Sequence, residues 1–225
     1  MEETGHVHAL PVAVEYGDLE MTITPTAVET PRGLVLVDVG PHGIADALEI
    51  HLEDLGYGLE DVWLVILTHH DGDHVGGVEE LRARADPIVA AHPEETAFLT
   101  GERDPQKGDA DSYRTTDVDL EVTDGVRIPT LAGPMIVLET PGHTPGHLSF
   151  FLPDEELLIA GDALVADGEE PLSGPKPAYT AEMDRALESL QRLTNLEIER
   201  VLCHHGGYVE DGTERIREIY EERTA

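Results

Sequence analysis

The chain has 225 residues, of which 40% are hydrophobic and 27% are charged, and this composition supports a folded protein with one substantial core. Its 14 Lys and Arg residues stand against 47 Asp and Glu residues, which gives a formal net charge of −33. This balance argues against a nucleic-acid partner, because binding to phosphates needs clustered cations. The carboxylates are spread over every segment instead of forming an acidic tail, so we expect a folded protein with an acidic surface.

A net charge of this size repels itself in dilute buffer, whereas salt at 1 M shortens the Debye length to about 3 Å. The composition therefore predicts a cytoplasmic protein of a halophile, with an ordinary acidic enzyme as the alternative. Cys203 is the only cysteine, which excludes an internal disulfide and a zinc site built from several thiolates. The sequence has no signal pattern and no stretch of about 18 apolar residues, so we expect no membrane partner. The oligomeric state is left open.

Strand and helix patterns alternate along the chain, and we expect one domain that spans residues 1–225, with a frayed start at 1–4. In chain order, the expected strands are 12–14, 21–28, 34–38, 62–67, 88–91, 118–122, 126–128, 135–139, 147–151, 157–160 and 200–203. The expected helices are 44–55, 75–85, 94–99, 181–193 with Thr180 as the N-cap, and 212–222. The polar segment 101–117 predicts a mobile loop or a substrate lid, and 167–180, with three prolines, predicts a second loop.

Four of the apolar strands end in His or Asp residues, which are common metal ligands in proteins. The run 62–67 leads into Thr68-His69-His70-Asp71-Gly72-Asp73-His74, and later strands end at His143, Asp162 and His204-His205. Strand ends converge at one edge of a sheet, so these side chains can meet although the sequence scatters them. Imidazole and carboxylate ligands without a thiolate cluster suit zinc, manganese or iron, and the number of ligands exceeds what one ion needs. The pattern therefore indicates a catalytic site for two metals.

At these motifs the chain resembles the metallo-β-lactamase superfamily. The resemblance rests on five ordered motifs that cover nearly the whole chain: Asp38-Val39-Gly40, Thr68 to Gly77, Thr140 to His147, Gly161-Asp162 and Cys203 to Gly207. It implies an α/β fold, a four-layer αβ/βα sandwich of two mostly antiparallel or mixed sheets flanked by helices, with the metals at one edge.

The resemblance also implies a ligand set for two divalent metals, zinc in the first place and iron or manganese as alternatives. One metal would be held by His69, Asp71 and His143, the other by Asp73, His74 and His205, with Asp162 between them. Asp71 departs from the family's commonest pattern, which has His at this position. Three aspartates and a hydroxide would balance two divalent ions, whereas a His would leave a charge of +1. We therefore expect a weaker Lewis acid and more tolerance of iron or manganese.

The activity that the resemblance implies is metal-dependent hydrolysis of a small-molecule substrate, an ester, thioester or lactone, by an activated water shared between the metals. Asp73 is expected to orient this water as well as to bind a metal. His204 and Tyr179 are further catalytic candidates, the first as a donor to the substrate and the second at the pocket mouth. The alternatives are an iron-dependent oxidoreductase of the same fold and a metal-binding protein without catalysis.

Several residues near the motifs have plainer interpretations. A calcium loop at 71–73 is disfavoured because the late Glu is missing and imidazoles flank it. His70 is expected to face solvent or to hydrogen-bond locally, and His147 to lie behind the metal ligands. Because His204 and His205 are adjacent on a strand, only one is expected to face the metals, and the family pattern favours His205. Cys203 is expected to be a buried apolar residue.

Overall fold

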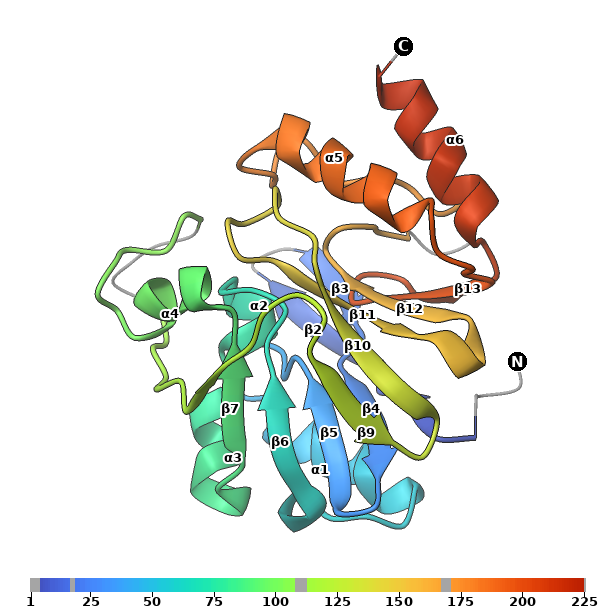
Figure 1. Cartoon of the computed structure of the whole chain (residues 1–225). Coiled ribbons are helices and arrows are strands. Elements are labelled where there is room, and N and C mark those ends of the chain that lie inside the picture. Colours follow the sequence, from blue (N-terminus) through green and yellow to red (C-terminus); the bar gives the residue numbers. More distant parts are fainter. Residues whose placement is uncertain (1–4, 17–18, 108–112, 167–170, 225) are drawn as a thin grey trace.

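The computed structural model of the chain describes residues 5–16, 19–107, 113–166 and 171–224. The expected frayed start at 1–4 lies outside these ranges, as do parts of the two expected loops, 108–112 and 167–170. Two six-stranded sheets stack face to face, and helices cover their outer faces (Figure 1). The expected four-layer sandwich is confirmed. Within the described ranges, no helix is both long and apolar enough to span a membrane.

The first sheet is built mainly from the first half of the chain. In spatial order its strands are β1 (Val7–Ala9), β4 (Thr26–Thr30), β5 (Gly33–Val37), β6 (Val62–Ile66), β7 (Ile88–Ala91) and β8 (Leu120–Glu121). The four strands from β5 to β8 run parallel. Because parallel strands end at the same edge, the residues that follow β5 and β6 are neighbours.

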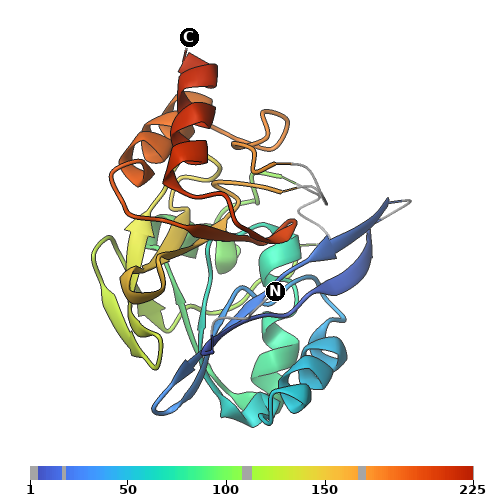
Figure 2. The same ribbon diagram turned by 90° about the vertical axis from the view of Figure 1, so that its right-hand side faces the viewer.

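The second sheet comes from the rest of the chain. Its spatial order is β14 (Gly207–Val209), β13 (Arg200–Cys203), β12 (Leu157–Gly161), β11 (Leu148–Leu152), β10 (Gly133–Glu139) and β9 (Arg127–Thr130). Only β12 and β13 pair in parallel, and the other pairs are antiparallel. The loops after β10, β12 and β13 consequently open at one edge. A separate hairpin of β2 (Val12–Tyr16) and β3 (Leu19–Ile23) extends away from the sheets (Figure 2).

Helices complete the outer layers. They are α1 (Ala45–Asp54), α2 (Gly72–Val75), α3 (Val78–Ala85), α4 (Pro93–Leu99), α5 (Met183–Leu193) and α6 (Thr213–Thr224), with short 3₁₀ turns η1 (Leu59–Asp61) and η2 (Pro153–Glu155). The helices α1 and α3 cover the first sheet, while α5 and α6 pack together on the second.

The buried apolar residues form three layers, one between the sheets and one under each set of helices. Strand β5 shows why: Leu34 and Leu36 pack toward α1 and α3, whereas Val35 and Val37 pack between the sheets. Successive side chains of a strand point to opposite faces, and here both faces are covered, so the strand is apolar throughout. The two sheets are therefore fixed against each other, and so are the loops at their edge.

The expected single strand at 21–28 is wrong, because β3 ends at Ile23 and β4 begins at Thr26. Pro25 lacks the N–H that a continuous ladder needs. At this break the Thr24 N–H instead donates to the backbone oxygen of His204, at 2.8 Å. Residues 24–25 thus connect the start of the chain to the last metal-binding motif.

The helix expected at 181–193 begins two residues later, at Met183, and Thr180 is not its N-cap. The Thr180 hydroxyl donates to the Lys176 oxygen, at 2.8 Å. The backbone N–H groups of Ala181 and Glu182 donate to the oxygens of His143 and Gly142. These bonds hold the segment before α5 on the loop that carries His143. The helix expected at 75–85 is also divided, into α2 and α3, by Gly76 and Gly77.

Candidate metal centre

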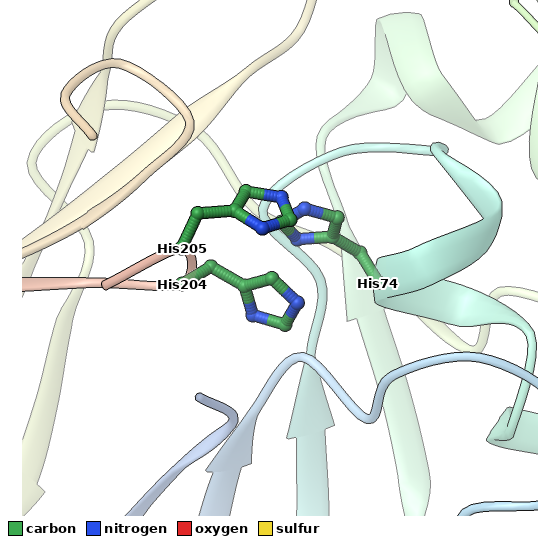
Figure 3. A group of neighbouring side chains, drawn as sticks. All are labelled: His74, His204 and His205. Carbon is green, nitrogen blue, oxygen red and sulfur yellow. The ribbon is translucent and has the colours of Figure 1, made fainter. Parts of the chain in front are cut away.

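The predicted ligands come from the same edge of both sheets. The first sheet supplies the segment after β6, where His69 and Asp71 lie before α2, and where Asp73 and His74 lie on α2 itself. The second sheet supplies His143, Asp162 and His205 from the ends of β10, β12 and β13. Figure 3 shows His74 facing His204 and His205 across the boundary between the sheets.

One group of ligand atoms gathers around Asp71 and His143. The Asp71 Oδ2 lies 3.3 Å from His69 Nε2 and 3.1 Å from His143 Nε2. The His143 Nε2 is also 3.5 Å from Asp162 Oδ2. One nitrogen or oxygen from each of His69, His143 and Asp162 falls within 4.8 Å of the others. These spacings are those of atoms able to converge on a single ion.

A second group gathers on the other side of Asp162. The Asp162 Oδ1 lies 3.3 Å from His74 Nε2 and 3.7 Å from His205 Nε2. The Asp73 Oδ2 lies 3.2 Å from His205 Nε2 and 4.0 Å from His74 Nε2. Asp162 presents one carboxylate oxygen to each group. The predicted division into two ligand sets thus corresponds to two adjacent groups of atoms that share Asp162.

Buried atoms without hydrogen bonds show that these groups fit metal ions. Eight side-chain nitrogen or oxygen atoms of the described residues are buried without a hydrogen-bond partner, and four of them lie in the site: His69 Nε2, Asp71 Oδ1, His74 Nε2 and Asp162 Oδ1. Leaving such atoms unpaired in a protein interior costs free energy that a coordinated cation would recover. All four atoms belong to the predicted ligand set, and nitrogen and carboxylate oxygen together suit zinc, iron or manganese.

The rings of His69 and His74 are held from behind by different groups. Thr68 Oγ1 lies 2.9 Å from His69 Nδ1, and it donates to Asp38 Oδ2 at 2.7 Å. The same Asp38 oxygen accepts a hydrogen bond from His74 Nδ1, at 2.7 Å, and Asp38 Oδ1 accepts one from the Thr68 N–H, at 2.8 Å. Both rings consequently turn Nε2 toward the site, as hydrogen-bonded histidine ligands commonly do.

His147 fixes the backbone at Asp162. Its Nε2 accepts a hydrogen bond from the Asp162 N–H, at 3.0 Å, and its Nδ1 is 2.8 Å from Thr140 Oγ1. The Thr140 hydroxyl is 2.8 Å from that of Ser149, which donates to the Ala160 oxygen. Burial, together with the nearby His143, lowers the pKa of His147 to about 3, so the ring is neutral and can accept this bond. The structure places His147 behind the ligands, where we expected it.

The two groups differ in protonation. Burial and the adjacent His74 hold the pKa of His69 well below its usual value. Burial would also lower the pKa of His74, but the carboxylates of Asp38 and Asp162 raise it well above the usual value. For Asp162, burial favours the neutral acid, yet the nearby histidines, His74 first, hold its pKa well below the usual range. Burial would lower the pKa of His205 as well, but its hydrogen bond to Asp73 raises it. The site therefore contains ionised carboxylates, the neutral imidazole of His69, and two imidazoles, those of His74 and His205, that favour a proton.

His204 lies beneath His74. The two rings stack with centroids 3.8 Å apart, and His204 Nε2 donates to the backbone oxygen of Asp73, at 3.1 Å. A nitrogen of His204 also falls within 4.8 Å of nitrogens of His74 and His205, so these three could in principle hold an ion. Burial, together with His74, lowers the pKa of His204 to about 3. His205 Nε2 lies beside the carboxylates of Asp73 and Asp162, whereas His204 Nε2 is bonded to the Asp73 backbone oxygen, so His205 is the better placed of the two.

Tyr179 contacts the site through its backbone. Its oxygen accepts a hydrogen bond from Lys107 Nζ, at 2.8 Å, while its side chain is 58% exposed. Lys107 Nζ also lies 2.5 Å from Asp71 Oδ2 and 2.7 Å from His143 Nε2. The sequence did not single out this lysine. Its one signal was scarcity, since Lys107 and Lys176 are the only lysines of the chain.

The sequence analysis also missed Glu95, which is fully buried on α4. Its carboxylate accepts hydrogen bonds from the backbone and Nδ1 of His70 and from the Gly146 N–H, at 2.7 Å. His70 is buried too and stacks on Phe98, with ring centroids 4.2 Å apart. The expectation of a local hydrogen bond or solvent contact for His70 is thus wrong, because α4 supplies both an acceptor and an aromatic face. Glu95 connects the loops that carry Asp71 and His143.

The sequence of the chain matches a known protein family. A sequence model described as the metallo-beta-lactamase superfamily matches residues 22–205, which include every predicted ligand. The chain belongs to this superfamily. The family is a group of metal-binding proteins, which agrees with the two groups of ligand atoms in the structure.

Similar proteins support the assignment. The chain is 30% identical over 202 residues to the "Probable metallo-hydrolase YflN" of Bacillus subtilis, covering 78% of this chain and 76% of that protein. It is 34% identical over 152 residues to a hydroxyacylglutathione hydrolase of Cereibacter sphaeroides, covering 68% of this chain but only 50% of that protein. A metallo-beta-lactamase family protein from Thermus thermophilus, TTHA1429, has a similar structure, with a TM-score of 0.78, 27% identity, and coverage of 97% of this chain and 79% of that one.

Proposed function

We propose that the protein is a metal-dependent hydrolase that acts on a small ester, thioester or lactone. The observation that carries the proposal is the pair of adjacent ligand groups that share Asp162, each with buried atoms lacking a hydrogen bond. Relatives named as hydrolases support the reaction type, although the chain spans about half of the hydroxyacylglutathione hydrolase. The ester, thioester and lactone classes are our own narrowing of that reaction type.

We assign the ligands as the family pattern suggests, and this assignment remains a proposal. The first ion would bind His69, Asp71 and His143, the second would bind Asp73, His74 and His205, and Asp162 would contact both. When bound, divalent ions polarise the scissile carbonyl and lower the pKa of water. Zinc is the first choice, and the carboxylate of Asp71 favours oxygen-preferring iron or manganese more than a His would.

The residues of the chain then have distinct tasks. Asp38 and Thr68 fix the rings of His69 and His74, so that both present Nε2. The exposed part of Asp73, whose side chain is 27% exposed, can accept a proton from the attacking water and orient it. His204 holds the Asp73 backbone, and Tyr179 holds Lys107 at the edge of the site. His204 and Tyr179 are therefore proposed to position other groups.

The experiment that tests the function is metal analysis of protein purified in high salt, followed by hydrolysis assays with ester, thioester and lactone substrates. We expect two equivalents of a divalent metal and turnover of at least one class. Asp71→His should be measured beside the native chain, with zinc preference increasing in the variant. Stoichiometric iron with oxygen consumption would favour the oxidoreductase alternative, and metal binding without turnover of any substrate would favour a non-catalytic protein.

We also propose that residues 1–225 form one domain and that the protein works in a cytoplasm with high salt. The formal net charge of −33 supports this, because salt screens the repulsion among carboxylates. Raising KCl from about 0.1 M to about 1 M, which shortens the Debye length from about 10 Å to about 3 Å, should raise the temperature of unfolding. A single transition is expected, and an unchanged or lower temperature would contradict the halophilic origin.

A further inference from the structure

A cluster of two imidazoles and one carboxylate lies on the first sheet, and none of its residues belongs to the proposed metal centre. His6 Nδ1 is 2.9 Å from Glu29 Oε2, and His8 Nε2 is 2.9 Å from Glu29 Oε1. His6 directly precedes the edge strand β1, His8 lies within it, and Glu29 belongs to the neighbouring strand β4. We call these three side chains the β1–β4 cluster.

Strand pairing brings the three side chains to one face of the sheet. Val7 pairs with Val28, and both side chains pack between the two sheets. Successive side chains of a strand alternate between faces, so the residues next to Val7 and Val28 face away from the second sheet. The Glu29 N–H donates to the His6 oxygen at 2.9 Å, which places these two residues opposite each other. The β1–β4 cluster therefore follows from the register of the two strands.

Among the described residues, no Lys or Arg forms an ion pair with the carboxylate of the cluster. The Glu29 side chain is only 15% exposed, and its ion-pair partners in these ranges are His6 and His8. Burial would raise the pKa of Glu29, but its hydrogen bonds with His6 and His8 lower it, so the carboxylate is ionised. An imidazole supplies a positive charge only while it is protonated. When both rings are neutral, a divalent cation would remove the cost of this buried charge.

The donor atoms of the cluster suit zinc. Zinc binds imidazole nitrogen and carboxylate oxygen at about 2.0 to 2.2 Å, so two ligand atoms of one ion lie roughly 3 to 3.5 Å apart. Each imidazole–carboxylate pair already has nearly this spacing. In the described ranges, three ligand atoms within 4.8 Å of one another occur only around the proposed metal centre, so one ring of the cluster has to turn to share an ion. The His6 side chain, 43% exposed, has room to turn, whereas that of His8 is 9% exposed.

We propose that His6, His8 and Glu29 form a further metal site, which binds one zinc ion or a similar late first-row divalent cation. Two histidines and one carboxylate leave a fourth position for water. The ion would link the edge strand β1 to β4 through side chains, in addition to the three residue pairs of the backbone ladder. The alternative is a pair of hydrogen bonds that hold β1 in place and have no affinity for metal.

Zinc analysis of protein without an affinity tag tests the proposal. The protein is dialysed against buffered zinc at the concentration that just fills the site, and bound zinc per chain is measured by mass spectrometry. His6→Gln and Glu29→Gln should each bind one ion fewer than the native protein, because loss of a ligand should weaken the site by more than about a hundredfold, beyond the usual cost of losing an outer hydrogen bond. His51→Gln is the matched control, since this ring contacts the Pro11 oxygen. Equal zinc content in the native protein and both cluster variants would overturn the proposal.

Chemical modification of the native protein locates the ion, and it decides the outcome even if a variant fails to fold. Diethyl pyrocarbonate acylates neutral imidazoles that solvent reaches, and the exposed ring of His6 is a suitable target. Saturating zinc should abolish modification of His6, whereas magnesium, which prefers oxygen ligands, should leave it unchanged. His51 should be modified equally with and without zinc. Modification of His6 at the same rate in the presence and absence of zinc would overturn the proposal.

Discussion

The two halves of the proposed metal site use the same kinds of residues but differ in what lies behind and above them. Behind His69 is the hydroxyl of Thr68, and behind His74 is the carboxylate of Asp38. Burial and the adjacent His74 lower the pKa of His69, whereas at His74 the carboxylates of Asp38 and Asp162 outweigh burial and raise the pKa. Lys107 contacts Asp71 in the first half, whereas the ring of His204 stacks on that of His74 in the second half.

Ligand identity alone is therefore not expected to determine the properties of the proposed two-metal site. Each half has one histidine and one aspartate from the segment after β6. Each also has one histidine from the second sheet. The first half is accompanied by a cation and a neutral ring, and the second by an additional buried carboxylate. We therefore expect metal binding in the second half to depend more strongly on pH than in the first.

The largest effect is expected from removing the residue that both halves share. Asp162→Ala takes one carboxylate oxygen from each group, so binding of both ions should weaken by more than about a hundredfold, beyond the usual cost of losing an outer hydrogen bond to a ligand. Metal titration with an indicator dye measures this. Asp154→Ala, in the turn η2, is the control. Retention of one tightly bound ion would show that Asp162 serves only one half.

A smaller effect that separates the halves is expected from Asp38→Asn. The substitution removes the carboxylate that holds His74 Nδ1, and metal affinity should fall about ten- to a hundredfold in the second half. At a metal concentration just sufficient to fill both halves of the native protein, the number of bound ions per variant chain should decrease from two to one. Asp38 contacts His69 only through the Thr68 hydroxyl, so the ion of the first half should weaken less. Equal weakening of both ions would contradict this difference, and Asp61→Asn in η1 provides the matched control.

Glu95→Gln tests the support behind the first half. Glu95 accepts bonds from His70 and Gly146 in a fully buried position, and losing its charge should reduce the free energy of unfolding by about 2 kcal/mol. Denaturation in urea measures the change. Glu94→Gln, next to it on α4, is the control and should be close to neutral, and equal effects of the two variants would show that the buried network does not support this region.

The smallest effect concerns pH. A raised pKa means that His74 still carries a proton above its ordinary pKa of about 6.5, and that proton competes with the metal. His205, in the same half, also has a raised pKa, because its hydrogen bond to Asp73 outweighs burial. The affinity of the second half should therefore fall as pH decreases, by at most about tenfold per unit for each proton displaced. His69, with its lowered pKa, has no such proton near neutral pH. Titrations at several pH values should show one ion lost first, and parallel loss of both would refute the difference.

Much of the fold and of the ligand geometry follows from local patterns. Apolar strands that end in His or Asp predicted which loops meet, because strand direction and the buried faces of β5 and β6 leave few alternatives. The break at Pro25 was missed because the residues on both sides are apolar or β-branched, and only the tertiary bond from Thr24 to His204 shows why the strand stops.

The residues that could not be predicted act from a distance in sequence. In the sequence, Glu95 looks like an ordinary acidic residue on the exposed face of a helix. Nothing near it in the chain indicates that it would accept hydrogen bonds from His70 and Gly146. Lys107 lies in a polar segment without periodicity, so its contact with Asp71 depends on how that segment folds back. Local sequence patterns predict helices and strands, whereas these contacts depend on how the helices, strands and loops pack against one another.

The proposed ligands come from both sheets, and this has a consequence for folding. The first sheet supplies His69, Asp71, Asp73 and His74, and the second supplies His143, Asp162 and His205. Neither sheet alone provides a complete set of ligands for either ion. The free energy of metal binding therefore becomes available only after the two sheets have packed together. The metal concentration in the cell would thus set how much of the newly made chain persists in its native form.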